Sequence, residues 1–149
     1  MENIAVIGAG TMGNGIAHVF AQHNYKVHLI DISKSALDSA IETISRNLDR
    51  QVLKDLITKD SKDKTLNNIS TFTSIQEGII HSDLIIEAVS ENEELKLKIF
   101  NEMDRLAPES AILASNTSSI SIARIASATK RPDKVIGMHF MNPVPIMKL

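Results

Sequence analysis

The sequence predicts an α/β fold with a doubly wound, mostly parallel sheet, and three observations support this prediction. Residues 4–7 are apolar and precede a glycine-rich turn, after which apolar residues recur at helical spacing. Short apolar runs of strand length then alternate with amphipathic stretches of helical length, which is the order that produces a parallel sheet covered by helices. The helical pattern after the second strand is longer than a crossover helix needs, so a projecting helix pair is also predicted.

The opening turn reads GAGTMG and fits the pattern G-x-G-x-x-G between a strand and a helix. In that pattern Gly8 permits the tight turn, Gly10 lets a pyrophosphate approach the backbone, and Gly13 lets the helix pack closely on the strand. The free N–H groups at the start of the helix then bind phosphate oxygens. The predicted dinucleotide contacts are Gly8, Ala9, Gly10, Thr11, Met12 and Gly13.

The second predicted strand, residues 27–30, ends in Asp31. This acid lies about 20 residues after the glycine turn, where the fold places a carboxylate on the adenosine ribose. A carboxylate there accepts hydrogen bonds from the ribose hydroxyls and repels a 2′-phosphate, which favours NAD over NADP. The alternative is an exposed aspartate at a strand end with no ligand.

The rest of the chain continues the alternation. A helical stripe formed by Leu37, Ile41, Ile44 and Leu48 predicts a helical stretch over residues 34–58, and the polar residues 58–68 are expected to form a loop. The later elements are expected as strands over 69–73, 83–89, 111–114 and 135–140 and as helices over 75–81, 92–106 and 121–128. Residues 146–149 resemble the start of another strand.

Composition excludes several classes of function. The net charge is −2, the aromatic content is 3%, and the basic residues form no cluster, so a nucleic-acid partner is not expected. The absence of cysteine excludes disulfides and thiolate catalysis. The histidines show no metal-ligand spacing, and no apolar run is long enough for a membrane span. A cytoplasmic protein without a bound metal is the expectation.

Three polar stretches follow predicted strands: EAVSEN at 87–92, SNTSS at 115–119 and MHFMNPVP at 138–145. Such sheets bind ligands at the carboxyl ends of their strands. Together with the glycine turn, these motifs resemble the 3-hydroxyacyl-CoA dehydrogenase family, with the bacterial 3-hydroxybutyryl-CoA dehydrogenases as the most similar group, over all 149 residues. The resemblance implies reversible oxidation of a 3-hydroxyacyl-CoA to the 3-oxoacyl-CoA with NAD as hydride acceptor.

The resemblance also implies two catalytic residues. His139 matches the family's general base, a role that suits imidazole because it titrates near neutral pH. Ser118 matches the serine that contacts the substrate oxygen and the cofactor. The alternatives are a strand-end histidine bonded to backbone and a serine that caps the following helix, although Thr117 or Ser119 could be that cap.

Further contacts follow from the resemblance alone. Asn142 matches an asparagine on the nicotinamide side, and Glu91 and Lys96 match cofactor contacts. Lys54 matches a lysine near the CoA phosphates. The alternatives are a turn asparagine, a helix-start acid and surface lysines.

The sequence departs from the family in one respect. The family orients its histidine with a glutamate about a dozen residues downstream, whereas only ten residues follow His139 and none is acidic. Residues 1–149 are therefore expected to form an NAD-binding Rossmann domain that lacks its last strands and the family's C-terminal helical domain. That domain forms the homodimer of the family. Such a chain is expected to bind NAD but to turn over slowly; the alternatives are a non-catalytic NAD-binding protein and another β-hydroxyacid dehydrogenase.

Overall fold

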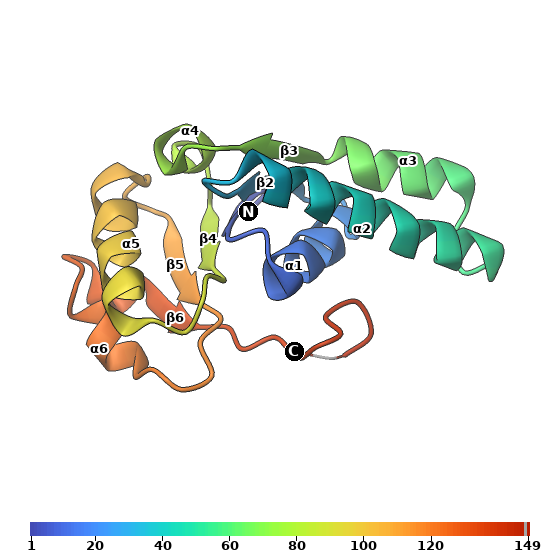
Figure 1. The fold of residues 1–149 in the computed structure, drawn as a ribbon. Helices are drawn as coiled ribbons and strands as arrows, with labels where there is room; N and C mark the ends of the chain where they lie inside the picture. The colour runs from blue at the N-terminus through green and yellow to red at the C-terminus, as the bar shows by residue number, and fades with distance from the viewer. Residues whose placement is uncertain (148) are drawn as a thin grey trace.

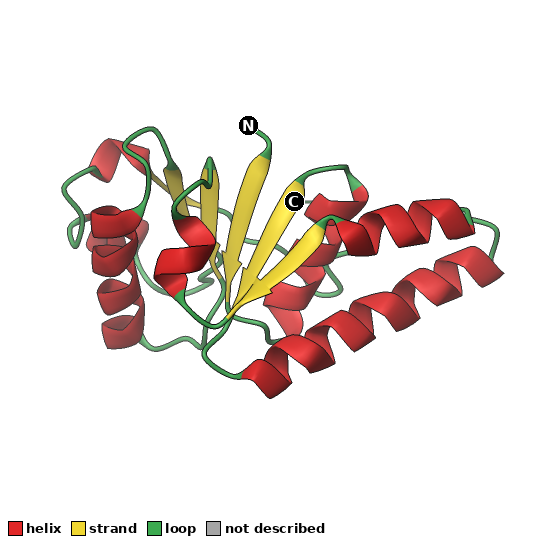
Figure 2. Ribbon diagram, turned by 90° about the horizontal axis from the view of Figure 1, so that it is seen from above, coloured by secondary structure: helices red, strands yellow, loops and turns green. Residues whose placement is uncertain are grey.

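The computed structural model describes residues 1–147 and 149 and contains one sheet of six parallel strands (Figures 1 and 2). The strands are β1 (Asn3–Ile7), β2 (Lys26–Ile30), β3 (Ile69–Phe72), β4 (Leu84–Glu87), β5 (Ile112–Ser115) and β6 (Val135–Gly137). Their order is β3-β2-β1-β4-β5-β6, and all five pairings are parallel. The chain winds outward in both directions from β1 and β4, so the predicted doubly wound sheet is confirmed.

Helices cover both faces of the sheet (Figure 1). They are α1 (Thr11–Gln22), α2 (Lys34–Leu53), α3 (Lys59–Asn67), α4 (Ile75–Ile79), α5 (Glu93–Leu106) and α6 (Ile122–Ala126), with a short 3₁₀ helix over Pro132–Lys134. None of the helices in the described part of the chain has the length and apolar character needed to cross a lipid bilayer.

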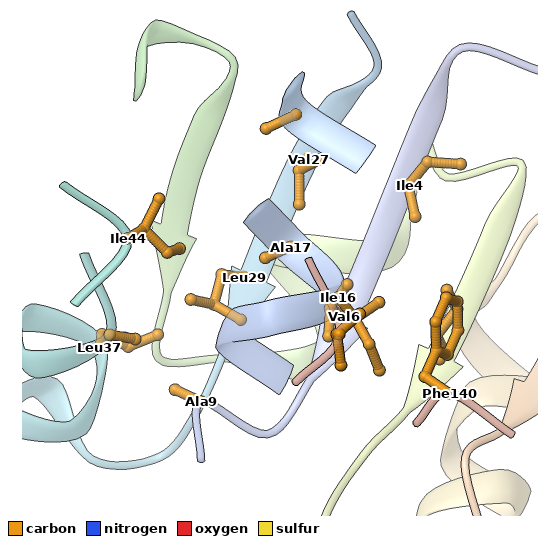
Figure 3. Packing of buried hydrophobic residues seen from close by; sticks show 14 of the residues in the cluster. Ile4, Val6, Ala9, Ile16, Ala17, Val27, Leu29, Leu37, Ile44 and Phe140 are labelled. Atoms are coloured by element: carbon orange, nitrogen blue, oxygen red, sulfur yellow. The ribbon is translucent and has the colours of Figure 1, made fainter. Parts of the chain in front are cut away.

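The core has two layers, because successive strand residues point to opposite faces. On one face, Ile4 and Val6 of β1 pack with α1 and α2, and Figure 3 shows this cluster together with Phe140. On the other face, Ala5 and Ile7 pack with α4, α5 and α6. The sheet is therefore buried on both sides at β1, where the glycine turn leaves it.

A helix pair projects after β2 as predicted, but its bounds differ from the prediction. The first helix, α2, ends at Leu53 instead of at residue 58, and the second, α3, occupies residues 59–67, so the prediction of a loop over residues 58–68 is wrong. Thr58 caps α3 by accepting a hydrogen bond from the Ser61 backbone N–H at 3.1 Å, and Thr65 is buried in this short helix. The loop was predicted because residues 58–68 are mostly polar. A helix that packs on other helices needs only a narrow buried face, and α3 packs on α1 and α2.

The strand expected over 135–140 is shorter than predicted. Gly137 is its last residue, and although the Met138 N–H still donates to the Ser115 carbonyl, the Phe140 N–H donates to the Asn116 side chain instead of to a neighbouring strand. The chain leaves the sheet at this point. Ile146, expected to begin another strand, lies in a turn, and Lys148 lies outside the described residues.

Candidate functional site

The glycine turn joins β1 to α1 at the point where the strand order reverses. Gly8 has a φ of +104°, and a Cβ there would lie 2.6 Å from the Ala88 carbonyl oxygen. A Cβ on Gly13 would lie 1.7 Å from the Gly8 carbonyl oxygen, so both residues must be glycine, as predicted. A Cβ on Gly10 would meet no atom within 4 Å. The backbone of the turn is therefore open above Gly10, where a pyrophosphate is expected.

The start of α1 differs from the starts of the other helices. Its N-cap is Gly10, and no side chain accepts from its first N–H groups. Each of the later helices α2 to α6 begins with a serine, threonine or asparagine whose side chain accepts a backbone N–H. The N-terminus of α1 therefore retains free donors and the positive end of a helix dipole, which fits a diphosphate.

Asp31 lies half-buried at the carboxyl end of β2, beside the glycine turn. Its Oδ2 accepts a hydrogen bond from the Ala9 backbone N–H and its Oδ1 accepts one from the Ser33 backbone N–H, both at 2.9 Å. Two backbone donors orient the carboxylate, and each oxygen keeps a further lone pair for a hydroxyl donor. This geometry is compatible with a ribose ligand.

A cavity of about 380 Å³ lies next to the turn, between the start of α1 and the loops that follow β4, β5 and β6. Five of the predicted site residues line it, and four of them follow strands β4 to β6: Glu91, Ser118, His139 and Asn142. Met12 of the glycine turn lines the same cavity. Residues that lie far apart in the sequence therefore meet at one edge of the sheet because the carboxyl ends of parallel strands share that edge.

A buried ion pair lies behind this cavity. The Nζ of Lys96 in α5 is 2.6 Å from Glu87 Oε1 at the end of β4, and the two side chains are 1% and 0% exposed. The same Nζ donates to the Val89 carbonyl at 3.3 Å and is 3.1 Å from Glu91 Oε1. All three N–H groups of the ammonium therefore have an acceptor, which a buried charge requires.

Glu91 connects this ion pair to the Ser118 loop. Its Oε2 accepts hydrogen bonds from the hydroxyls of Thr117 and Ser119, both at 2.7 Å. Burial acts to raise the pKa of Glu91, but the hydrogen bonds from Ser119, Thr117 and Lys96 together with the Lys96 charge outweigh it and lower this pKa to about 2. Glu91 therefore stays ionised across the neutral range.

Ser118 is exposed and lies between the two residues that Glu91 holds. The hydroxyl oxygen of Thr117 accepts from the Ile120 backbone N–H at 3.0 Å, and Ser121 is the N-cap of α6. The alternative interpretation of Ser118 as the helix cap is therefore wrong. Ser118 lines the cavity, while its neighbours complete the turn.

His139 is exposed and lines the same cavity from the segment that follows β6. The segment that carries it is held by the hydrogen bond from the Phe140 backbone N–H to Asn116 Oδ1, at 2.9 Å, and by burial of the Phe140 ring against Phe20 of α1. Within the described residues the imidazole has no hydrogen-bond partner, so the alternative interpretation, a histidine bonded to backbone, is wrong. Both ring nitrogens are open to a ligand.

Sequence reasoning did not assign roles to Glu87, Ser115 and Asn116. The Ser115 hydroxyl donates to Glu87 Oε2 at 2.7 Å, and Asn116 anchors the His139 segment. A usable signal was present, because a glutamate that ends a wholly apolar strand must be paired when buried. The interpretation of Lys96 as a surface lysine is wrong for the same reason, since the side chain is buried against Glu87.

Lys54 lies away from the small cavity, in a groove of about 1040 Å³ between α2, α3 and residues 143–146. Arg50 and Lys64 line the same groove, as do the polar side chains of Asn47 and Gln51. The groove is therefore basic on its helical side. Among the described residues no cluster of histidine and acidic side chains could hold a metal ion.

These features define a dinucleotide-binding domain of the Rossmann class. The glycine turn lies where the strand order reverses, the start of α1 is open, Asp31 lies beside the turn, and a histidine and a serine line the neighbouring cavity. Residues 3–149 match the family described as "3-hydroxyacyl-CoA dehydrogenase, NAD binding domain". The chain belongs to this family, and NAD is the cofactor of this domain.

Several known proteins are similar to the chain. The 3-hydroxybutyryl-CoA dehydrogenase of Bradyrhizobium diazoefficiens is 48% identical over 149 residues, which are all of this chain and 50% of that protein. The 3-hydroxyadipyl-CoA dehydrogenase of Escherichia coli is 43% identical over all of this chain and 31% of that protein. The crystal structure of (S)-3-hydroxybutyryl-CoA dehydrogenase from Ralstonia eutropha superimposes with a TM-score of 0.97, at 43% identity, over all of this chain and 52% of that chain. The chain thus spans at most about half the length of these relatives.

Proposed function

We propose that this chain is the cofactor-binding part of an NAD-dependent 3-hydroxyacyl-CoA dehydrogenase, which oxidises a 3-hydroxyacyl-CoA reversibly to the 3-oxoacyl-CoA. The observation that carries the proposal is the cavity beside the glycine turn, where His139 and Ser118 line one space next to the open start of α1. Relatives named as 3-hydroxybutyryl-CoA dehydrogenases cover the whole chain and support the same activity.

In the proposed reaction His139 is the general base. A neutral imidazole takes the proton from the 3-hydroxyl group as the C3 hydrogen leaves with its electron pair. Bound NAD supplies the acceptor for that hydride. Ser118 donates a hydrogen bond to the substrate oxygen, which becomes the carbonyl oxygen of the product. The open ring nitrogens of His139 and the exposed hydroxyl of Ser118 support these roles.

The remaining residues bind the cofactor in this proposal. The backbone of the turn from Gly8 to Gly13 holds the pyrophosphate, and Asp31 accepts hydrogen bonds from the adenosine ribose. Asn142 and Glu91 line the small cavity, where the proposal places the nicotinamide. Lys96 contributes through Glu91, whose carboxylate it orients from the buried side.

We propose the basic groove for the phosphates of CoA. Lys54, Arg50 and Lys64 supply three cations around one cavity, which suits a ligand with several phosphate charges. Pro143 and Pro145 line the far side of the groove and belong to the segment that also carries His139. An acyl-CoA bound there could extend from the helix pair toward the small cavity.

His139 has no carboxylate partner among the described residues, and such a partner would stabilise the imidazolium that the reaction forms. We therefore expect the 149-residue chain alone to bind NAD but to turn over slowly. A second part, corresponding to the rest of the relatives' length, would add the carboxylate, the last strands of the sheet and the dimer interface.

The test is a fluorescence titration of the purified chain with NADH, with and without acetoacetyl-CoA. The proposal expects saturable NADH binding that acetoacetyl-CoA changes, and expects Lys54→Ala to weaken the acetoacetyl-CoA effect but not NADH binding itself. Lys59→Ala, on the exposed start of α3, is the matched control. NADH binding that acetoacetyl-CoA leaves unchanged would favour the non-catalytic NAD-binding protein, and rapid reduction of acetoacetyl-CoA would contradict the expected slow turnover.

A further inference from the structure

Gly15 has no role in the glycine pattern of the turn, yet a larger residue does not fit there. It lies buried inside α1, where its backbone is helical and does not require glycine. Glycine in a helix interior is destabilising relative to alanine, so a glycine at this position calls for a packing reason. A Cβ at this position would lie 2.9 Å from Val144 Cβ and 3.0 Å from Val144 Cγ2.

Val144 belongs to the segment that follows His139 and runs beside α1 (Figure 1). Within residues 138–147 only Phe140 and Val144 are buried, whereas Met141 and Asn142 between them are exposed. Both buried side chains rest on α1. The Phe140 ring meets Phe20 edge to face at a centroid distance of 6.2 Å, and Val144 fills the space left open by Gly15.

The segment between these two anchors lines the small cavity, and His139 immediately precedes the first anchor. Asn142 lies between the anchors and lines the same cavity. The helix that supports the segment is also the helix whose start is open for the pyrophosphate. Val144 is therefore one of two anchors of this segment on α1, and Asn142 lies only two residues before it.

We propose that Gly15 is a positioning residue, which holds the His139–Asn142 segment at its working distance from the nicotinamide end of the cofactor by admitting Val144. This inference rests on the proposed function for its consequence, but the packing that it describes does not. A methyl group at position 15 displaces Val144 outward and moves His139 and Asn142 with it. The proposed contacts of the glycine turn with the pyrophosphate and of Asp31 with the adenosine ribose stay in place, because the new methyl group meets Val144 and Pro145 rather than the turn.

The test compares Gly15→Ala, Val144→Ala and the double variant of the 149-residue chain. The first readout is the NMR signal of the His139 imidazole and the Asn142 side chain, which needs no ligand. The second is the ratio of the dissociation constants for NADH and ADP-ribose, because only NADH reaches the nicotinamide end. Thermal unfolding shows that each variant is folded.

Gly15→Ala is expected to shift the His139 and Asn142 signals and to weaken NADH binding about tenfold, while ADP-ribose binding changes less than about twofold. The double variant is expected to return both readouts toward the wild type, because Val144→Ala removes the methyl groups that the new Cβ meets. Unchanged signals in Gly15→Ala, or no recovery in the double variant, would overturn the inference. If the NMR signals shift in Gly15→Ala and recover in the double variant while the wild-type chain binds neither NADH nor ADP-ribose, that result would support the positioning of the segment by Gly15 and refute the proposed function.

Discussion

The two walls of the small cavity are built in different ways. The Ser118 wall is held by hydrogen bonds and charge, through Glu87, Lys96 and Glu91. The His139 wall is held mainly by apolar packing of Phe140 and Val144 on α1, with one hydrogen bond from the Phe140 backbone to Asn116. The difference teaches that the position of Ser118 depends on charge balance, whereas that of His139 depends on shape.

The largest expected effect comes from breaking the Ser118 wall with Lys96→Met. This change leaves Glu87 charged, buried and without its partner, so we expect a loss of about 3–5 kcal/mol in the free energy of unfolding, measured with urea. Lys98→Met, an exposed lysine on the same helix, is the control and should change stability by less than about 0.5 kcal/mol. The pair Glu87→Gln/Lys96→Met should recover much of the loss. If Lys96→Met were as stable as Lys98→Met, Lys96 would not compensate the buried charge of Glu87.

The His139 wall should respond less strongly, because shape rather than charge is changed. Phe140→Leu keeps an apolar side chain but weakens the contact with Phe20, and about 1 kcal/mol of stability should be lost. NADH binding should weaken as well, whereas the binding of ADP-ribose should stay near the wild-type value. If the affinities for NADH and ADP-ribose fell equally, Phe140 would support the whole domain instead of this wall.

The pH dependence of stability separates the two walls further. The pKa of Glu91 is lowered from 4.5 to about 2, so its contribution to stability is complete above about pH 4.5 and is lost as the pH falls toward 2. Because Glu91 is 42% exposed, solvent screening should limit that contribution to about 1 kcal/mol or less. Replacing both donors, as in Thr117→Val/Ser119→Ala, should flatten the stability curve between these pH values, and an unchanged curve would contradict this assignment.

The smallest effect on stability is expected for His139→Gln. The side chain is exposed and has no hydrogen-bond partner among the described residues, so unfolding in urea should change by less than about 0.5 kcal/mol. NADH binding should persist, while any slow reduction of acetoacetyl-CoA by the chain should disappear. A large loss of stability would mean that the imidazole supports the fold.

Local signals in the sequence predicted most of the sheet and the glycine turn. Residues 4–7 alternate between two cores in the structure, and the asparagine at 92 caps α5 where the helical pattern begins. The errors lie where local and tertiary signals conflict. Residues 59–67 are polar but helical because α1 and α2 supply a surface for them. Met138 and Phe140 are apolar and were expected in the last strand, but the chain leaves the sheet after Met138 because the Asn116 side chain accepts the Phe140 N–H.

The sequence by itself determined the order of the six strands, the glycine turn and the presence of Asp31, because these depend on short-range periodicity and on backbone sterics. It also placed His139, Ser118 and Glu91 at strand ends. Only the tertiary structure decided that Glu87 and Lys96 form a buried pair and that Gly15 receives Val144. The Gly15–Val144 contact joins segments distant in the chain, whereas Glu87 and Lys96 are only nine residues apart. In both cases the local sequence pattern does not show which side chains pack around the residue, and that packing decides whether a charge is buried or the space beside a glycine is occupied.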